Sequence, residues 1–432
     1  GPAKYLLDPW QLGHAYGLTL GRSPLYMDTT RTARGQIGYD LGLPRMRLLS
    51  LPVAEFFSPW PTRIAWNVIR QNNWDTRWEQ GDADTVQTRA VRARTLGTDF
   101  SLAFGFWKGQ SSSFSLGVGR DLLYPWYGDL SMNTGREVNR TQNLSLSQDL
   151  NLLNLFMPRL SYDAVYRSSR LAPHTTSGRD SLGRPGATVS ATKRLNLRVG
   201  LVQALRYVAR LRDERLDEQA PPGSPRWILA RLDRWSGNIT DPTIVIARTE
   251  GTDYRDLVSY PDYRYRLGLE PLLDGIVPYD RTISDNLQVS GGVRPISSMS
   301  VRSEYARTDT RHFYSGYWNR RLATTWPSVS VSWTGLERFA PLERILRSGT
   351  LSTGYRFETT ESGRFEDDEY IRTSKTESTR WSPLFSISGT LKNTVQITLS
   401  DNVTNSVTIN YTGTRACTRS NSNSFSLNLQ YA

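Results

Sequence analysis

The sequence predicts an all-β fold: a transmembrane antiparallel β-barrel, or a sector of a very large one, with roughly 14 to 18 strands in this chain and short helical excursions. Apolar and polar residues alternate along much of its length, and the polar positions are mostly Ser, Thr, Asn and Gln. No run approaches the roughly 18 apolar residues of a transmembrane helix. Because no Pro/Gly-rich linker divides the 432 residues into compositionally distinct halves, we expect a single transmembrane β-barrel region over residues 1–432.

The alternation is clearest between residues 381 and 431. Val395, Ile397 and Leu399 alternate with Thr and Gln, and residues 425–431 repeat the pattern with Ser, Asn and Gln. A side-chain period of two indicates a β-strand with one apolar face. A water-exposed soluble sheet would more often carry Lys and Glu on its other face, whereas a polar face with little charge is typical of the inside of a membrane barrel.

The same alternation recurs upstream and predicts further strands. In residues 99–106, for example, Phe100, Leu102 and Phe104 fall on one side, with small residues between them. The upstream stretches of this kind are 15–20, 35–43, 64–68, 99–106, 114–119, 144–147, 160–166, 287–289, 299–305, 329–333 and 351–357.

Proline is expected at the openings of strands, because the first residue of a strand does not need its N–H for the ladder. Two such openings resemble each other, residues 260–270 and 326–337, and are either strand starts with the same turn chemistry or an internal repeat. The prolines placed in this way are Pro61, Pro158, Pro261, Pro327 and Pro383.

Two stretches depart from the strand pattern. Residues 202–219 place apolar side chains at helical spacing and end at a Pro-Pro-Gly stop, and residues 336–347 predict a short helix closed by Ser348 and Gly349. Both are expected to be excursions between strands.

The formal charge of +12 raises the question of nucleic-acid binding. The basic residues are spread along the whole chain and no recognition motif is present, so no nucleic-acid partner is expected. Arginines in loops, inside a wide lumen or against anionic lipid headgroups account for the charge. Many of the 13 Trp and 21 Tyr stand near strand ends, as the aromatic girdles of a membrane barrel would.

No combination of residues predicts catalysis. His14, His174 and His312 are far apart and lack metal-ligand spacing, and residues 366–369 are expected to be a solvated acidic loop tip. The single cysteine, Cys417, excludes an intrachain disulfide and is expected to be an exposed or polar-loop thiol. The glycines of residues 117–119 lie in a strand pattern, not in a dinucleotide-binding loop. We therefore expect no enzyme, and no catalytic, cofactor-binding or metal site and no cofactor.

Six segments, in this order along the chain, resemble the C-terminal part of the SprA/Sov family, the outer-membrane translocon of the type IX secretion system. The resemblance covers most of residues 30–412. The segments are 56–61, 151–156, 260–263 with 267–271, 281–287 with 289–293, 333–337, and 382–384 with 391–393.

The resemblance implies a protein-conducting barrel in the bacterial outer membrane that exports folded cargo to the cell surface and supports gliding motility in some members. The implied partners are secreted cargo proteins with a C-terminal sorting signal, a periplasmic plug protein, a PorV-like shuttle barrel and membrane lipids. Family chains are far longer and continue with further hairpins, so this chain is expected to be a fragment that forms one sector of a larger barrel.

Two other functions remain open from the sequence. A self-closing porin or transporter barrel of about 16 strands predicts that residues 15–20 pair with residues 425–431. A secreted β-rich adhesin or carbohydrate-binding protein predicts that the face of Val395, Ile397 and Leu399 is buried by another sheet.

Overall fold

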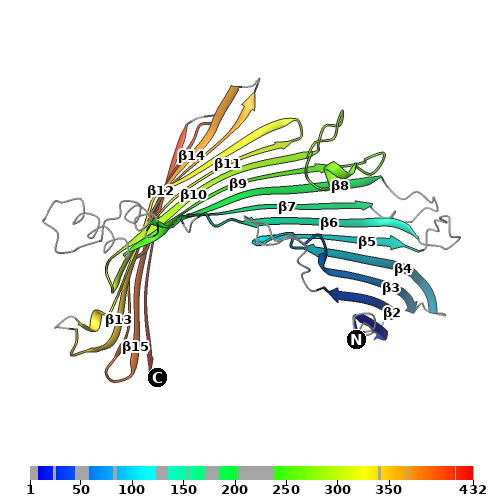
Figure 1. Cartoon of the computed structure of the whole chain (residues 1–432), viewed down its shortest axis with the longest axis horizontal. Helices are drawn as coiled ribbons and strands as arrows, with labels where there is room; N and C mark the ends of the chain where they lie inside the picture. The colour runs from blue at the N-terminus through cyan, green and yellow to red at the C-terminus, as the bar shows by residue number, and fades with distance from the viewer. Residues whose placement is uncertain are drawn as a thin grey trace. The chain divides into compact units, whose positions relative to one another are not determined.

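The computed structural model describes residues 8–22, 26–43, 58–80, 85–122, 135–152, 155–170, 184–201, 203, 238–338, 342–366, 369–413 and 415–431. They form one antiparallel sheet of 16 strands, in which each strand lies beside the strands that precede and follow it in the chain (Figure 1). This result confirms the all-β antiparallel prediction and the expected number of strands.

Most strands are longer than the sequence pattern indicated. The longest, β14, has 23 residues, and the first two have 13 and 17. Their bounds are β1 Trp10–Arg22, β2 Tyr26–Gly42, β3 Pro61–Gln80, β4 Thr85–Phe104, β5 Gln110–Asp121, β6 Arg136–Asp149, β7 Phe156–Arg170, β8 Pro185–Val199, β9 Ile239–Tyr254, β10 Asp280–Ile296, β11 Met299–Tyr314, β12 Tyr317–Thr334, β13 Leu346–Glu366, β14 Glu369–Leu391, β15 Val395–Asn410 and β16 Ala416–Tyr431.

The chain divides into two compact units. The first comprises Gly1–Gln148, Ser161–Thr192 and Glu250–Asp280, and so contains β1 to β6 together with the parts of β7, β8 and β9 that meet the β9–β10 connection. The second comprises Asp149–Leu160, Lys193–Thr249 and Arg281–Ala432, with most of β10 and all of β11 to β16.

Strand register places the alternating residues on two distinct faces, here called the apolar face and the polar face. Between β15 and β16, Leu399 pairs with Leu427, and the neighbouring pair, Ser400 with Ser426, points to the opposite side. The apolar side chains of β16 remain uncovered, with Phe425 64% and Leu427 57% exposed. The adhesin hypothesis requires a second sheet that covers this face, and the described residues form no such sheet.

The main buried cluster lies in the first unit, where the β9–β10 connection (residues 255–279) packs against β7, β8 and β9. Its buried members are Tyr166, Ala187, Val189, Tyr254, Leu257 and Tyr265. Tyr265 belongs to the short helix α4 (Tyr263–Arg266), whose first turn is capped by Asp262 accepting a hydrogen bond from Tyr265 N at 3.0 Å. Burial raises the pKa of Tyr265 well above its ordinary value, since ionisation would place an anion in this cluster.

The helix expected over residues 336–347 is wrong for residues 342–347, and residues 339–341 lie outside the described part of the chain. A 3₁₀ turn, η1, spans Leu336–Arg338, and β13 begins at Leu346, so Ser348 and Gly349 belong to a strand. Non-local hydrogen bonds decide this, because Gly349 N donates to the Glu337 carboxylate at 3.0 Å and Gly335 N donates to Gly349 O at 3.0 Å. The helix expected over 202–219 lies outside the described residues except for Gln203. No helix in the described part of the chain is long and apolar enough to cross a membrane.

Only one of the five prolines opens a strand as expected, namely Pro61 at the start of β3; Pro158 is the third residue of β7. Pro327 and Pro383 lie inside β12 and β14, each at a shift of strand register. A bulge leaves one residue unpaired, so a proline there costs no ladder hydrogen bond. Pro261 lies in the β9–β10 connection, before α4.

The two stretches that resemble each other therefore differ in structure. Residues 260–270 form a connection that contains α4, whereas residues 326–337 run along β12 into η1. Their interpretation as strand starts with the same turn is wrong.

Candidate functional site

Six strands of the second unit carry a continuous row of serines on the polar face. The strand register places one serine of each strand directly opposite a serine of the next, and the Oγ atoms of the last pair are 2.7 Å apart. Side chains of directly paired residues in neighbouring strands are close enough to interact. From β11 to β16 the row consists of Ser300, Ser332, Ser352, Ser386, Ser400 and Ser426.

An apolar row lies on the opposite face at the immediately adjacent positions of the same strands. Every serine of the row is therefore one residue away from a large apolar side chain that points to the other side of the sheet. From β11 to β16 the apolar row consists of Met299, Trp333, Leu351, Ile387, Leu399 and Leu427.

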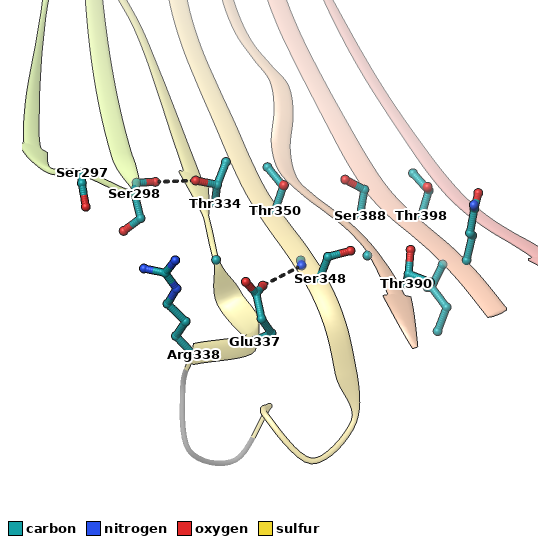
Figure 2. A pocket seen from close by; sticks show the side chains of 15 residues that line it. Ser297, Ser298, Thr334, Glu337, Arg338, Ser348, Thr350, Ser388, Thr390 and Thr398 are labelled. Carbon is teal, nitrogen blue, oxygen red and sulfur yellow. Dashed lines mark hydrogen bonds between the residues drawn. The ribbon is translucent and has the colours of Figure 1, made fainter. Parts of the chain in front are cut away.

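Next to the serine row, a second hydroxyl row lines a cleft of about 760 Å³ between the strand ends and η1 (Figure 2). Thr334 donates to Ser298 O at 3.2 Å at one end of this row. Figure 2 shows Glu337 and Arg338 of η1 beside it, with Glu337 held by the backbone of β13. The row itself consists of Thr334, Thr350, Ser388 and Thr398.

The polar face of the last two strands carries no charge along its described length. Every second residue of β15 from Gln396 to Asn410, and of β16 from Thr418 to Gln430, is Ser, Thr, Asn or Gln. Such side chains hold water through hydrogen bonds but offer neither an apolar patch nor a fixed charge to a passing molecule.

The apolar face of the same unit is apolar over only part of the strand length. Val329 and Val331 lie between Trp333 and an aromatic row that begins with the contact of Tyr305 and Trp326, whose ring centroids are 6.2 Å apart. Trp326 and Trp333 are seven steps apart along the strand, which is about 23 Å at the usual rise, close to the apolar band of roughly 25 Å in membrane barrels.

Beyond the aromatic row, the same face becomes charged. The row continues with Tyr355 and Trp381, whose ring centroids are 4.6 Å apart. Past it, acidic and basic side chains form ion pairs, two of them between strands, Asp309 with Arg320 at 2.6 Å and Glu361 with Arg372 at 3.2 Å. The third lies within β14, between Lys375 and Glu377 at 2.7 Å. The aromatic row therefore separates an apolar band from a charged zone.

The residues considered for chemistry are not brought together. His14 lies exposed on β1, His312 lies on β11 against the ring of Tyr314, and His174 is outside the described residues. Within the residues that the structure describes, no group of three or more His, Cys, Asp or Glu side chains is placed to hold a metal ion.

The other predicted positions are consistent with structural roles. Glu366 ends β13 and Glu369 begins β14, and Glu366 forms an ion pair with Arg364 at 2.5 Å. The two residues between Glu366 and Glu369 lie outside the described part of the chain. Cys417 is exposed, as predicted, although it lies in β16 and not in a loop. The glycines of residues 117–119 lie inside β5, which confirms the strand assignment.

Sequence reasoning identified the polar face but missed the two hydroxyl rows. The alternation of Ser and Thr shows only that they share a face within one strand. Whether serines of six strands meet in one row depends on register, which the pattern of a single strand does not contain.

Comparison with known proteins adds little to this geometry. No protein-family model and no curated protein matches the sequence. Among solved structures, the chain is similar to the ferripyoverdine receptor of the outer membrane of Pseudomonas aeruginosa bound to ferripyoverdine, with 9% sequence identity and a TM-score of 0.25. The alignment covers 96% of this chain and 59% of the receptor, so the chain spans less than two thirds of that receptor's length. At this TM-score the likeness carries no argument, and the class of the protein rests on its own residues: a meander of long antiparallel strands with one polar and one apolar face.

Proposed function

We propose that this chain forms part of the wall of a transmembrane β-barrel in the bacterial outer membrane, and that the barrel conducts proteins as a type IX secretion translocon. The observation that carries the membrane location is the serine row set back to back with an apolar row, which is exposed at Ile387 and Leu427 and partly exposed at its other positions. A sheet with a hydroxyl row on one face and an uncovered apolar row on the other needs water on the first and hydrocarbon on the second.

Lipid supplies that apolar contact without a second protein layer. Covering one large apolar side chain is worth about 1.5 to 3 kcal/mol. Large apolar side chains are exposed on β16 and at Ile387 of β14, and those of β15 are partly exposed. The sheet also satisfies a second requirement of the membrane interior, because consecutive strands pair their backbone groups and leave only edge strands needing neighbours.

The chemistry of the polar face supports protein conduction. On β15 and β16 the polar face consists of hydroxyl and amide groups, which stay wet and offer neither apolar patches nor fixed charges that would retain an unfolded or folded polypeptide. Barrels of roughly 16 to 18 strands already enclose an aqueous channel, and a pore for folded cargo needs more. The 16 strands of this chain are therefore proposed as one sector of a wider barrel.

The resemblance to the SprA/Sov family supports the more specific assignment. Under it, the cargo is secreted protein with a C-terminal sorting signal, the partners are a periplasmic plug protein and a PorV-like shuttle barrel, and export serves the cell surface and gliding motility.

Cysteine accessibility tests the membrane wall. In a Cys417→Ser background, Ser386→Cys and Ser400→Cys are expected to react with a membrane-impermeant maleimide in intact membranes. Ile387→Cys and Leu399→Cys, one residue away, are expected to react only after solubilisation. Equal labelling of all four positions in intact membranes would contradict the proposed wall.

Photo-crosslinking tests the cargo. A photoreactive residue at Ser332 or Ser400 is expected to capture an exported polypeptide during secretion, while the same residue at Leu399 captures none. Capture at neither serine position during active secretion would argue against a protein-conducting role and leave a barrel with a different solute.

A self-closing porin of this chain alone is the second candidate. It is favoured by the even number of strands among the described residues, which lets β1 and β16 run antiparallel as neighbours. Their pairing stays a prediction. An antibody to residues 381–431 separates the candidates on a denaturing gel of the outer-membrane fraction. A band near 49.0 kDa favours the porin, a band several times larger favours the translocon sector, and a soluble band contradicts both.

A further inference from the structure

A cleft of about 510 Å³ in the first unit gathers four arginines at one end of β5, β6 and β7. One glutamate and one tyrosine complete it, so four positive groups face a single carboxylate and the net charge of the lining is +3. The charged and aromatic residues of this arginine cleft are Arg120, Arg136, Arg140, Arg170, Glu137 and Tyr260.

Glu137 neutralises only one of the arginines. It accepts two hydrogen bonds from Arg140, at 3.0 and 2.8 Å. The Nε atom of Arg120 is buried and has no hydrogen-bond partner within the part of the chain that the structure describes. Arg136 is exposed and forms no ion pair with the residues described. A buried guanidinium nitrogen without a partner is costly, and an anion in the cleft would form charge-assisted hydrogen bonds with the guanidinium groups that line it.

Tyr260, from the β9–β10 connection, fixes two of the arginines in place. Arg170 Nε donates to the Tyr260 hydroxyl at 3.1 Å, and its guanidinium carbon lies 5.0 Å from the ring centroid. The guanidinium carbon of Arg140 lies 5.7 Å from the same centroid. Burial, together with the nearby Glu137 carboxylate, raises the pKa of Tyr260, so it remains a neutral partner. The cleft is thus organised before any ligand arrives.

The position of the cleft indicates the source of the anion. On β5, Arg120 follows Phe114, Leu116 and Val118 on the apolar face, two residues past the last of them. Two residues of a strand span about 7 Å, so the guanidinium lies just beyond the end of the apolar run. This is the depth at which lipid headgroups meet a membrane protein.

We infer that the arginine cleft binds the phosphate of a phosphorylated membrane lipid, whose acyl chains lie along the apolar face below it. This inference rests on the proposed membrane location. Arginine suits the ligand because its planar fork of N–H donors matches phosphate oxygens in pairs. A free phosphate ion would satisfy the same donors but gains nothing from the adjacent apolar side chains.

The test measures lipid binding to the full native polypeptide, purified in detergent, by native mass spectrometry with diphosphoryl lipid A as the probe. The Arg120→Gln/Arg136→Gln variant removes two charges that form no ion pair with the described residues, and is expected to weaken binding about tenfold or more. The matched control, Arg321→Gln/Arg347→Gln, removes two exposed charges of the second unit and is expected to bind as the unchanged protein does.

Two further probes identify the source of the phosphate. The unchanged protein is expected to bind dephosphorylated lipid A as weakly as the cleft variant binds diphosphoryl lipid A. Millimolar inorganic phosphate is expected to compete poorly with diphosphoryl lipid A for the unchanged protein. Equal binding of diphosphoryl lipid A by the cleft variant and the control variant, or full competition by inorganic phosphate, would overturn the inference. If the cysteine variants show the labelling expected of a membrane wall but the cleft variant binds lipid A as the unchanged protein does, only this inference fails. If the cysteine variants do not show that labelling, the proposed function fails first.

Discussion

Replacing Gly268 by alanine tests whether the β9–β10 connection is held by close packing against the sheet. Gly268 has a φ of +71°, and a Cβ added there would lie 2.9 Å from the Cβ of Ala191 and 3.0 Å from that of Ala164. It would also lie 2.9 Å from the Tyr162 hydroxyl, which donates to Leu267 O at 2.7 Å. Alanine in this backbone region costs about 1 to 2 kcal/mol, and the added overlap about 1 to 3 kcal/mol. Docking of the connection is therefore expected to weaken by about 2 to 5 kcal/mol.

Gly275, in the same connection, provides the matched control. Its φ is +73°, but no atom lies within 4 Å of an added Cβ, so Gly275→Ala carries only the backbone cost of about 1 to 2 kcal/mol. Limited trypsin digestion reports undocking, because Arg255, Arg264 and Arg266 lie in the connection. Cleavage tracks the undocked population when docking is fast, and each 1.4 kcal/mol is about tenfold, so Gly268→Ala should be cut about 5 to 150 times faster than Gly275→Ala. Equal cleavage rates would refute the packing argument.

Two other outcomes follow from the same structure. Ile387→Arg places a charge in the proposed lipid-facing band and is expected to lower the stability of the membrane-inserted barrel by about 2 to 4 kcal/mol, whereas Ser386→Arg should change it by less than about 1 kcal/mol. Urea titration of folding into lipid vesicles measures both, and an equal loss would contradict the assignment of faces. The raised pKa of Tyr265 means that the folded connection keeps a proton which the unfolded chain releases near pH 10. Its docking stability is therefore full below about pH 10 and falls as the pH rises further, and Tyr265→Phe should flatten this fall in the trypsin assay.

The sequence by itself determined the two faces of the sheet. Because successive side chains of a strand point to opposite sides, the alternation in residues 395–399 and 425–431 fixes which residues share a face before any strand has a partner. The uncharged character of the polar face of residues 395–410 and 416–431 was equally visible. These properties depend on neighbours along the chain, and the period of two is built into the backbone.

Only the tertiary structure decided which residues of neighbouring strands lie opposite each other. The serine row from Ser300 to Ser426 exists because five interstrand registers agree, and a shift of one residue in any of them would place an apolar side chain in the row. The bulges at Pro327 and Pro383, the start of β13 at Leu346 and the docking of Gly268 against Ala164 likewise depend on distant partners. The physical reason is that register is set by the sum of interstrand hydrogen bonds, turn geometry and packing between residues far apart in the chain, such as Tyr162 and Leu267, which are separated by 105 positions.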